Sequence, residues 1–130
     1  MIFKKMLMPL ISIEWTPEQF SAELSAYQQK YVLLDFSARW CGPCKRILPE
    51  IEILSAEYGA VAFFKVDIDK AQELAEHFNV THVPTFILMR KTDGQYQTVG
   101  SVQGANVDQV RNLLSGAIDP PRPPPINRTF

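Results

Sequence analysis

The stretch Tyr31-Val-Leu-Leu-Asp-Phe-Ser-Ala-Arg-Trp-Cys-Gly-Pro-Cys-Lys45 decides the fold of this chain. Residues 31–37 form a short apolar run of β-forming residues, which is typical of a buried strand. From Cys41 onward apolar residues recur at helical spacing, and Gly59 is placed to end that helix. The stretch therefore predicts a buried strand that leads through a short turn into a helix beginning at two cysteines.

The same alternation of strand and helix patterns extends to both sides of this stretch. Further strands are expected at 10–13, 61–67, 85–89 and 95–102, and further helices at 16–29, 69–78 and 106–116. Strands separated by helices require parallel pairing, whereas the hairpin signal Thr92-Asp-Gly94 adds an antiparallel pair. We expect an α/β fold with a single mixed sheet of about five strands and four helices on both faces.

The amino-acid composition of the chain argues against several classes of function. The chain has 130 residues, 46% apolar and 21% charged, which suits one folded domain. Thirteen basic against 14 acidic residues argue against nucleic acid or an anionic membrane as the main partner. No apolar run approaches the ~20 residues of a membrane span. Two cysteines cannot form the disulfide framework of a small secreted protein.

The ends differ from the middle, so the expected organisation is a lead segment at 1–9, a domain at 10–117 and a proline-rich tail at 118–130. Lys4 and Lys5 faintly resemble a signal peptide, but Pro9 interrupts the apolar residues. We expect a cytoplasmic protein, with an organellar or secreted one as the alternative. The tail favours polyproline II and has PxxP spacing around Arg122. An SH3-like module could read that spacing, or the tail could be a stiff appendage or pack on its own domain.

Cys41 and Cys44 lie three residues apart, on one face of the predicted helix and close enough for a disulfide. The N-terminus of a helix stabilises a thiolate, so Cys41 is expected to be the exposed nucleophile. Cys44, one turn further in, is expected to be more buried and to act as the resolving thiol. Gly42 lets a partner backbone approach, and Pro43 is tolerated in a first helical turn. This pattern indicates thiol–disulfide exchange in two steps.

Two other interpretations of the cysteines are weaker. His77 and His82 could complete a zinc site, but they lie much farther along the chain than a zinc finger allows. We therefore expect no metal. A purely structural disulfide is the other alternative.

Asp35 interrupts the apolar run of the first buried strand. Burying a carboxylate is costly, so it needs a partner or a raised pKa. Asp35 is either exposed at the edge of its strand or a proton acceptor for Cys44 beneath the site. Lys65, on the next strand, could modulate it.

Trp40-Cys-Gly-Pro-Cys-Lys45 resembles the active-site signature of the thioredoxin family, and the resemblance covers about residues 10 to 117. Leu34-Asp-Phe-Ser-Ala38, Lys65-Val-Asp-Ile-Asp69, Val83-Pro84-Thr85 and Gly104-Ala-Asn106 follow in the family's order. The resemblance implies that Asp35 is the buried acid and that Val83-Pro84 is a cis peptide. It also implies a docking surface for substrate chains, formed by Trp40, Gly42, Pro43, Val83, Pro84 and Gly104.

The family resemblance implies a general reductant of protein disulfides without a bound cofactor. It also implies electrons from NADPH through thioredoxin reductase, and a monomer, since no cysteine outside the signature is available. Oxidases and isomerases of the same fold usually carry His between the cysteines, which makes the disulfide more oxidising. An alternative of another class is a thioredoxin-fold module that binds a partner through its proline-rich tail.

Overall fold

Five strands form one mixed sheet in the order β1-β3-β2-β4-β5. The computed structural model describes residues 10–118, so the expected lead segment 1–9 and residues 119–130 of the tail lie outside it. The strands are β1 (Ile11–Ile13), β2 (Tyr31–Ser37), β3 (Val61–Asp67), β4 (Thr85–Thr92) and β5 (Gln95–Gln103). β1, β3 and β2 are parallel, whereas β4 and β5 add two antiparallel pairings.

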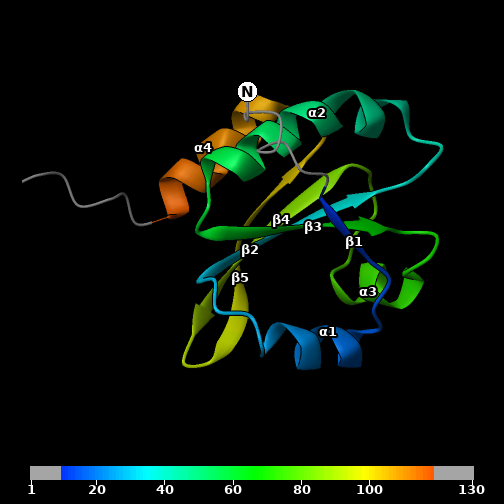
Figure 1. Cartoon of the computed structure of the whole chain (residues 1–130). Coiled ribbons are helices and arrows are strands. Elements are labelled where there is room, and N and C mark those ends of the chain that lie inside the picture. The colour runs from blue at the N-terminus through cyan, green and yellow to red at the C-terminus, as the bar shows by residue number, and fades with distance from the viewer. Residues whose placement is uncertain (1–9, 119–130) are drawn as a thin grey trace, which may run out of the picture.

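Four helices cover the sheet: α1 (Pro17–Leu24), α2 (Gly42–Glu57), α3 (Gln72–His77) and α4 (Val107–Ala117). α1 and α3 lie on one face, and α2 and α4 on the other (Figure 1). The expected fold class is therefore confirmed. Across residues 10–118, no helix is both long and apolar enough to span a bilayer.

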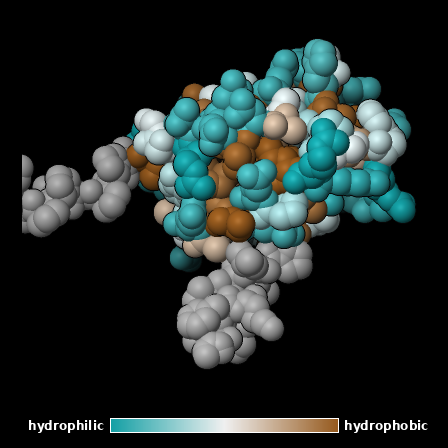
Figure 2. Space-filling view, turned by 90° about the horizontal axis from the view of Figure 1, so that it is seen from above, coloured by the Kyte–Doolittle hydropathy of each residue, from teal (hydrophilic) through white to brown (hydrophobic). Residues whose placement is uncertain are grey.

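A hydrophobic core lies on each side of the sheet. Val32, Leu34 and Phe36 of β2 belong to the core under α1 and α3, whereas Tyr31 and Leu33 belong to the core under α2 and α4. Each fully buried side chain of this kind contributes roughly 1.5–3 kcal/mol to stability. Because β2 is buried on both faces, its sequence is mainly apolar, with Asp35 and Ser37 as the exceptions, rather than alternating. The outer surface above α2 and α4 is mainly hydrophilic, with apolar side chains gathered near its middle (Figure 2).

Local sequence signals account for where the helices begin. Thr16 accepts a hydrogen bond from the Gln19 amide at 3.1 Å, and the Gln19 side chain accepts one from the Thr16 amide at 2.9 Å. This capping box, with Pro17 at the first helical position, starts α1 where the sequence predicts it. Asn106 caps α4 in the same manner, by accepting from the Gln109 amide at 3.1 Å.

Two helices are shorter than their periodicity predicts. α1 ends at Leu24 rather than near Gln29, because tertiary contacts hold the following residues. The Tyr27 ring packs edge-on against Phe64, and the Tyr27 carbonyl accepts from Lys91 Nζ at 2.8 Å. α3 begins at Gln72 rather than Asp69, since the amides of Lys70 and Ala71 donate to the carbonyl of Asp67 in a preceding turn.

Candidate active site

The two cysteines lie at the ends of β2 and β3. These parallel strands finish side by side, because Ser37 is paired in register with Asp67. The carboxyl ends of parallel strands are the usual place for a site in α/β sheets. Cys41 is the N-cap residue of α2, and Cys44 lies in the first turn of that helix. The turn after β2 therefore places both cysteines at one end of the sheet.

Cys41 and Cys44 form a disulfide, with their Cα atoms 5.3 Å apart. The Cys44 amide also donates a hydrogen bond to Cys41 Sγ at 3.1 Å. This sulfur thus sits where the first amides of α2 point, an environment that favours negative charge.

The expected difference in exposure between the two cysteines is wrong for this disulfide state. Cys41 is 4% exposed and Cys44 is 6% exposed, so neither residue is more accessible than the other. Both cysteines belong to a small apolar cluster with Ala38, against which Ile68 and Val83 pack. The position of Cys41 at the start of α2 is therefore not enough to make it exposed.

Of the residues expected to dock substrate chains, Val83 packs on this cluster. Trp40 is 67% exposed beside Cys41, and Gly42 and Pro43 are exposed as well. The Val83–Pro84 peptide bond is cis. Gly104 donates its amide to the Pro84 carbonyl at 2.8 Å and has φ +100°, a conformation that favours glycine. The loop before β4 and the loop after β5 are thereby held together, and Val83 of the first loop packs on the cysteine cluster.

Asp35 is buried, so its interpretation as an exposed strand-edge residue is wrong. The residue is 3% exposed, and within the described part of the chain its Oδ1 has no hydrogen-bond partner. Burial raises the pKa of Asp35 from 3.8 to about 7, while the positive charge of Lys65 acts in the opposite direction. The carboxyl group can therefore gain or lose a proton near neutral pH.

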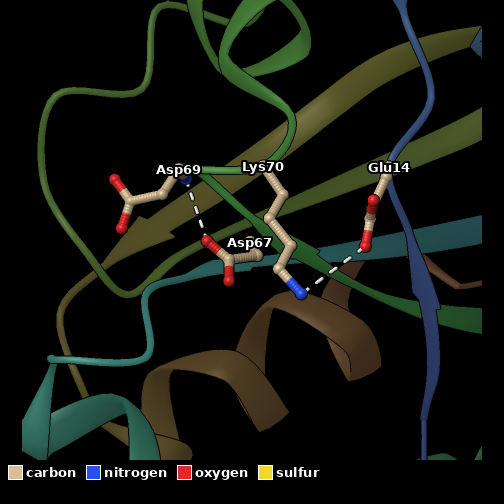
Figure 3. Close-up of polar contacts among 4 residues, drawn as sticks. All are labelled: Glu14, Asp67, Asp69 and Lys70. Atoms are coloured by element: carbon tan, nitrogen blue, oxygen red, sulfur yellow. Dashed lines mark hydrogen bonds and ion pairs between the residues drawn. The ribbon is translucent and has the colours of Figure 1, made fainter.

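A pocket of about 690 Å³ connects this carboxyl to the disulfide. Both Asp35 and Cys44 line it, together with Lys65 and Trp40. Glu14 and Lys70 form an ion pair at 3.8 Å and line the same pocket (Figure 3). The pocket is large enough to hold water, which could carry a proton between the acid and the sulfur.

Comparison with known proteins shows which proteins this chain is similar to. The family model for thioredoxin matches residues 11–115. Human thioredoxin is 42% identical over 96 residues, covering 74% of this chain and 88% of that protein. Chicken thioredoxin is 37% identical over 99 residues, covering 76% of this chain and 90% of that protein. The crystal structure of the reduced Schistosoma mansoni thioredoxin pre-protein superposes with a TM-score of 0.74 and 37% identity, covering 85% of this chain and all of that one.

The chain belongs to the thioredoxin family. It is a thiol–disulfide oxidoreductase, and its redox centre is the dithiol that this structure holds as the Cys41–Cys44 disulfide. Members of this family act on protein disulfides.

The structure of this thioredoxin-family chain adds Asp69 to the site, which the sequence analysis did not single out. Trp40 Nε1 donates a hydrogen bond to Asp69 Oδ2 at 2.9 Å. Asp69 is itself held by its amide, which donates to Asp67 Oδ1 at 2.9 Å (Figure 3). Two acidic residues, Asp67 at the end of β3 and Asp69 just after it, were the available signal, because that strand ends beside the strand that leads to Trp40.

The histidines considered as zinc ligands form no metal-binding group with the cysteines among residues 10–118. His77 is exposed in the last turn of α3, and His82 is exposed in the following loop. In the part of the chain that the structure describes, no three His, Cys, Asp or Glu side chains are grouped to hold a metal ion.

Proposed function

We propose that this chain is a general reductant of protein disulfides in which Cys41 is the nucleophile. The observation that carries the proposal is the placement of Cys41 Sγ at the N-terminus of α2, where the Cys44 amide donates to it at 3.1 Å. In the reduced chain these amides stabilise a thiolate. The Cys41 thiolate attacks one sulfur of the substrate disulfide, forms a mixed disulfide and releases the other substrate sulfur as a thiolate.

Cys44 is the resolving thiol in the second step, and Asp35 is its proton acceptor. Asp35 takes the proton of Cys44 through the shared pocket, and the Cys44 thiolate attacks Cys41 Sγ. The mixed disulfide breaks, the second substrate thiolate leaves, and the Cys41–Cys44 disulfide forms. The pKa of about 7 suits an acceptor at neutral pH. Lys65 modulates this pKa, because its positive charge favours the carboxylate.

Substrate chains dock on the surface formed by Trp40, Gly42, Pro43, Val83, Pro84 and Gly104. An extended segment of the substrate pairs with the backbone at Val83, as a strand added by main-chain hydrogen bonds. Such contacts carry little side-chain preference, which supports a broad substrate range. Gly42 and Pro43 place no charge between the cysteines, which favours reduction over oxidase or isomerase activity.

The electrons come from NADPH through a thioredoxin reductase, with no cofactor bound to this chain. Each cycle delivers two electrons, which convert the Cys41–Cys44 disulfide back to two thiols. A reductant of this kind works in a compartment that keeps thiols reduced, and we place it in the cytoplasm.

Reduction of insulin disulfides with NADPH and thioredoxin reductase tests the proposal. The wild-type chain should turn over, Cys41→Ser should be inactive, and Cys44→Ser should accumulate a mixed disulfide that mass spectrometry detects. Dithiothreitol in place of the reductase separates a failure of the donor from a failure of the chain. No turnover with either donor would overturn the general-reductant proposal and favour a partner-binding role.

A further inference from the structure

A second hollow lies on the other side of the sheet, between α1, the residues that follow α3, and β5. Its volume is about 1070 Å³. We call it the α1–β5 groove, and its apolar lining and its carboxylate come from Phe20, Leu24, Phe78, Met89, Tyr96 and Glu18. Tyr96 is paired with Lys91 near the β4–β5 turn, whereas the cis-Pro loop precedes the opposite end of β4. The disulfide chemistry therefore does not use this groove.

The groove has fixed aromatic walls. Phe20 and Phe78 meet edge to face, with ring centroids 5.4 Å apart. The Tyr96 hydroxyl donates to the carbonyls of Gln29 and Tyr27, which holds the ring in place. Phe78 and Tyr96 are half-buried, so both present apolar surface to an incoming segment. Aromatic-lined grooves of this kind bind proline-rich segments, which are already in the polyproline II conformation and lose little entropy.

The chain carries such a segment itself, in residues 119–130. This segment contains Pro120, Pro121 and residues 123–125, all prolines, and its charges are Arg122, Arg128 and Asp119. The side chains of the segment carry two positive charges and one negative charge, which sum to +1. Of the residues lining the groove, Glu18 is the one carboxylate, and neither Lys nor Arg is among them. The charges of the segment and the groove are complementary.

The segment also starts within reach of the groove. Tyr31 donates its hydroxyl to the Ala117 carbonyl at 3.2 Å, so the end of α4 lies at the start of β2. Across the sheet Tyr31 is paired with Arg90, and Arg90 with Gln97, which lines the groove. Two strand spacings make roughly 10 Å, and passing to the other face of the sheet adds about 10 Å. Twelve residues of polyproline II extend ~37 Å.

We propose that residues 119–130 dock into the α1–β5 groove of the same chain. The prolines pack against Phe78 and Tyr96, and Arg122 approaches Glu18. Because the segment is tethered at Ile118, its effective concentration at the groove is on the order of millimolar, so weak contacts are enough. Docking leaves the surface around the disulfide uncovered, and an SH3-like module can then no longer bind the PxxP segment.

Paramagnetic relaxation enhancement on the full-length oxidised protein tests this docking. In Asn127→Cys the new thiol takes a nitroxide maleimide, while Cys41 and Cys44 are protected as their disulfide. Amides of the groove, such as those of Phe78 and Gln97, should relax at least threefold faster than that of Ile53 on α2. Ser21→Arg, which fills the groove, should abolish the difference. Ala22→Arg is the matched control, because Ala22 is an exposed neighbour on α1 that does not line the groove.

Two further measurements make the test more specific: reversal of the charge at Glu18, and a mixture of spin-labelled and ¹⁵N-labelled chains. Glu18→Lys should reduce the enhancement at the groove at least twofold, whereas Glu23→Lys on the same helix should leave it unchanged. Uniform or absent enhancement, or enhancement that Ser21→Arg does not change, would overturn the proposal. So would equal enhancement in a mixture of spin-labelled and ¹⁵N-labelled chains, because the segment would then occupy a second copy.

Discussion

Asp35 of β2 is paired in register with Lys65 of β3, and this pairing places a positive charge beside the buried carboxyl under the disulfide. Burial raises the pKa of Asp35 to about 7, and Lys65 limits the rise. The same carboxyl that we propose as the proton acceptor is therefore also a source of pH-dependent stability.

Asp35→Asn should flatten the dependence of stability on pH. Between pH 4 and 7 the folded chain retains a proton that the unfolded chain has lost, so the free energy of unfolding falls as pH rises through this window. The full shift corresponds to on the order of 4 kcal/mol, an upper bound for the gain of the variant at pH 8. Guanidinium unfolding at pH 4, 6 and 8 measures it, with Asp108→Asn as the exposed control. Equal slopes in wild type and Asp35→Asn would contradict the burial argument.

Lys65→Gln should raise the pKa of Asp35 further, because it removes the charge that favours the carboxylate. The ¹³C resonance of the Asp35 carboxyl follows this titration directly. The lower limb of the pH profile for disulfide reduction should move to higher pH with it. Lys70→Gln is the matched control, since Lys70 lines the same pocket but is paired with Glu14. If the Asp35 carboxyl titrates at the same pH in Lys65→Gln as in the wild type, Lys65 does not influence the pKa of Asp35.

Asp69→Ala should weaken catalysis without changing the cysteines. It removes the acceptor of the Trp40 indole, a hydrogen bond worth about 0.5–1.5 kcal/mol, so kcat/KM for a protein disulfide should fall roughly two- to tenfold. Asp69→Asn keeps an oxygen acceptor and should stay near wild type. Trp40 fluorescence should report greater mobility in the alanine variant alone. Identical kinetics for Asp69→Ala and wild type would show that the indole needs no such support.

Gly100→Ala should destabilise the fold, because an added Cβ would lie 2.5 Å from Leu113 Cδ1 of α4. Overpacking of this kind costs typically 1–3 kcal/mol. Gly116→Ala is the contrasting variant, because its Cβ meets nothing within 4 Å and α4 is helical there. That variant should gain about 0.5–1 kcal/mol. Thermal unfolding of both variants measures these changes in stability. An unchanged unfolding midpoint for Gly100→Ala would mean that Leu113 moves aside at no cost.

A chain that ends at Ile118 tests the proposed domain boundaries, 10–117 for the domain and 118–130 for the tail. Ile118 packs against the core under α2 and α4, and the disulfide makes no use of the α1–β5 groove. We therefore expect insulin reduction within about twofold of the full chain, since the core contacts that set the site geometry are retained. Loss of a binding partner with unchanged activity would assign the tail to recruitment, whereas loss of activity would place it in the support of the site.

The elements that the sequence predicts well are those with local causes. The capping box at Thr16 and the cap at Asn106 act within a few residues, so both helix starts are readable from the chain. The end of α1 is not, because Phe64 and Lys91 hold that segment from distant parts of the chain. The start of α3 is displaced by a turn at Asp67, which the helical periodicity does not reveal. The site divides in the same way, since Cys41 at the start of α2 is a local feature and its burial is not.

By itself the sequence determined the strand–turn–helix that carries Cys41 and Cys44, and the family to which they belong, because periodicity, capping and a short motif are properties of neighbouring residues. Only the tertiary structure decided that Asp35 is buried beside Lys65, that Asp69 holds Trp40, and that both sulfurs are covered. The two burials depend on how far water is excluded by segments that are distant along the chain, and the exposed Trp40–Asp69 hydrogen bond depends on two such segments meeting. Desolvation and long-range contacts are set by packing, so they arise only when β2, β3 and their following loops come together.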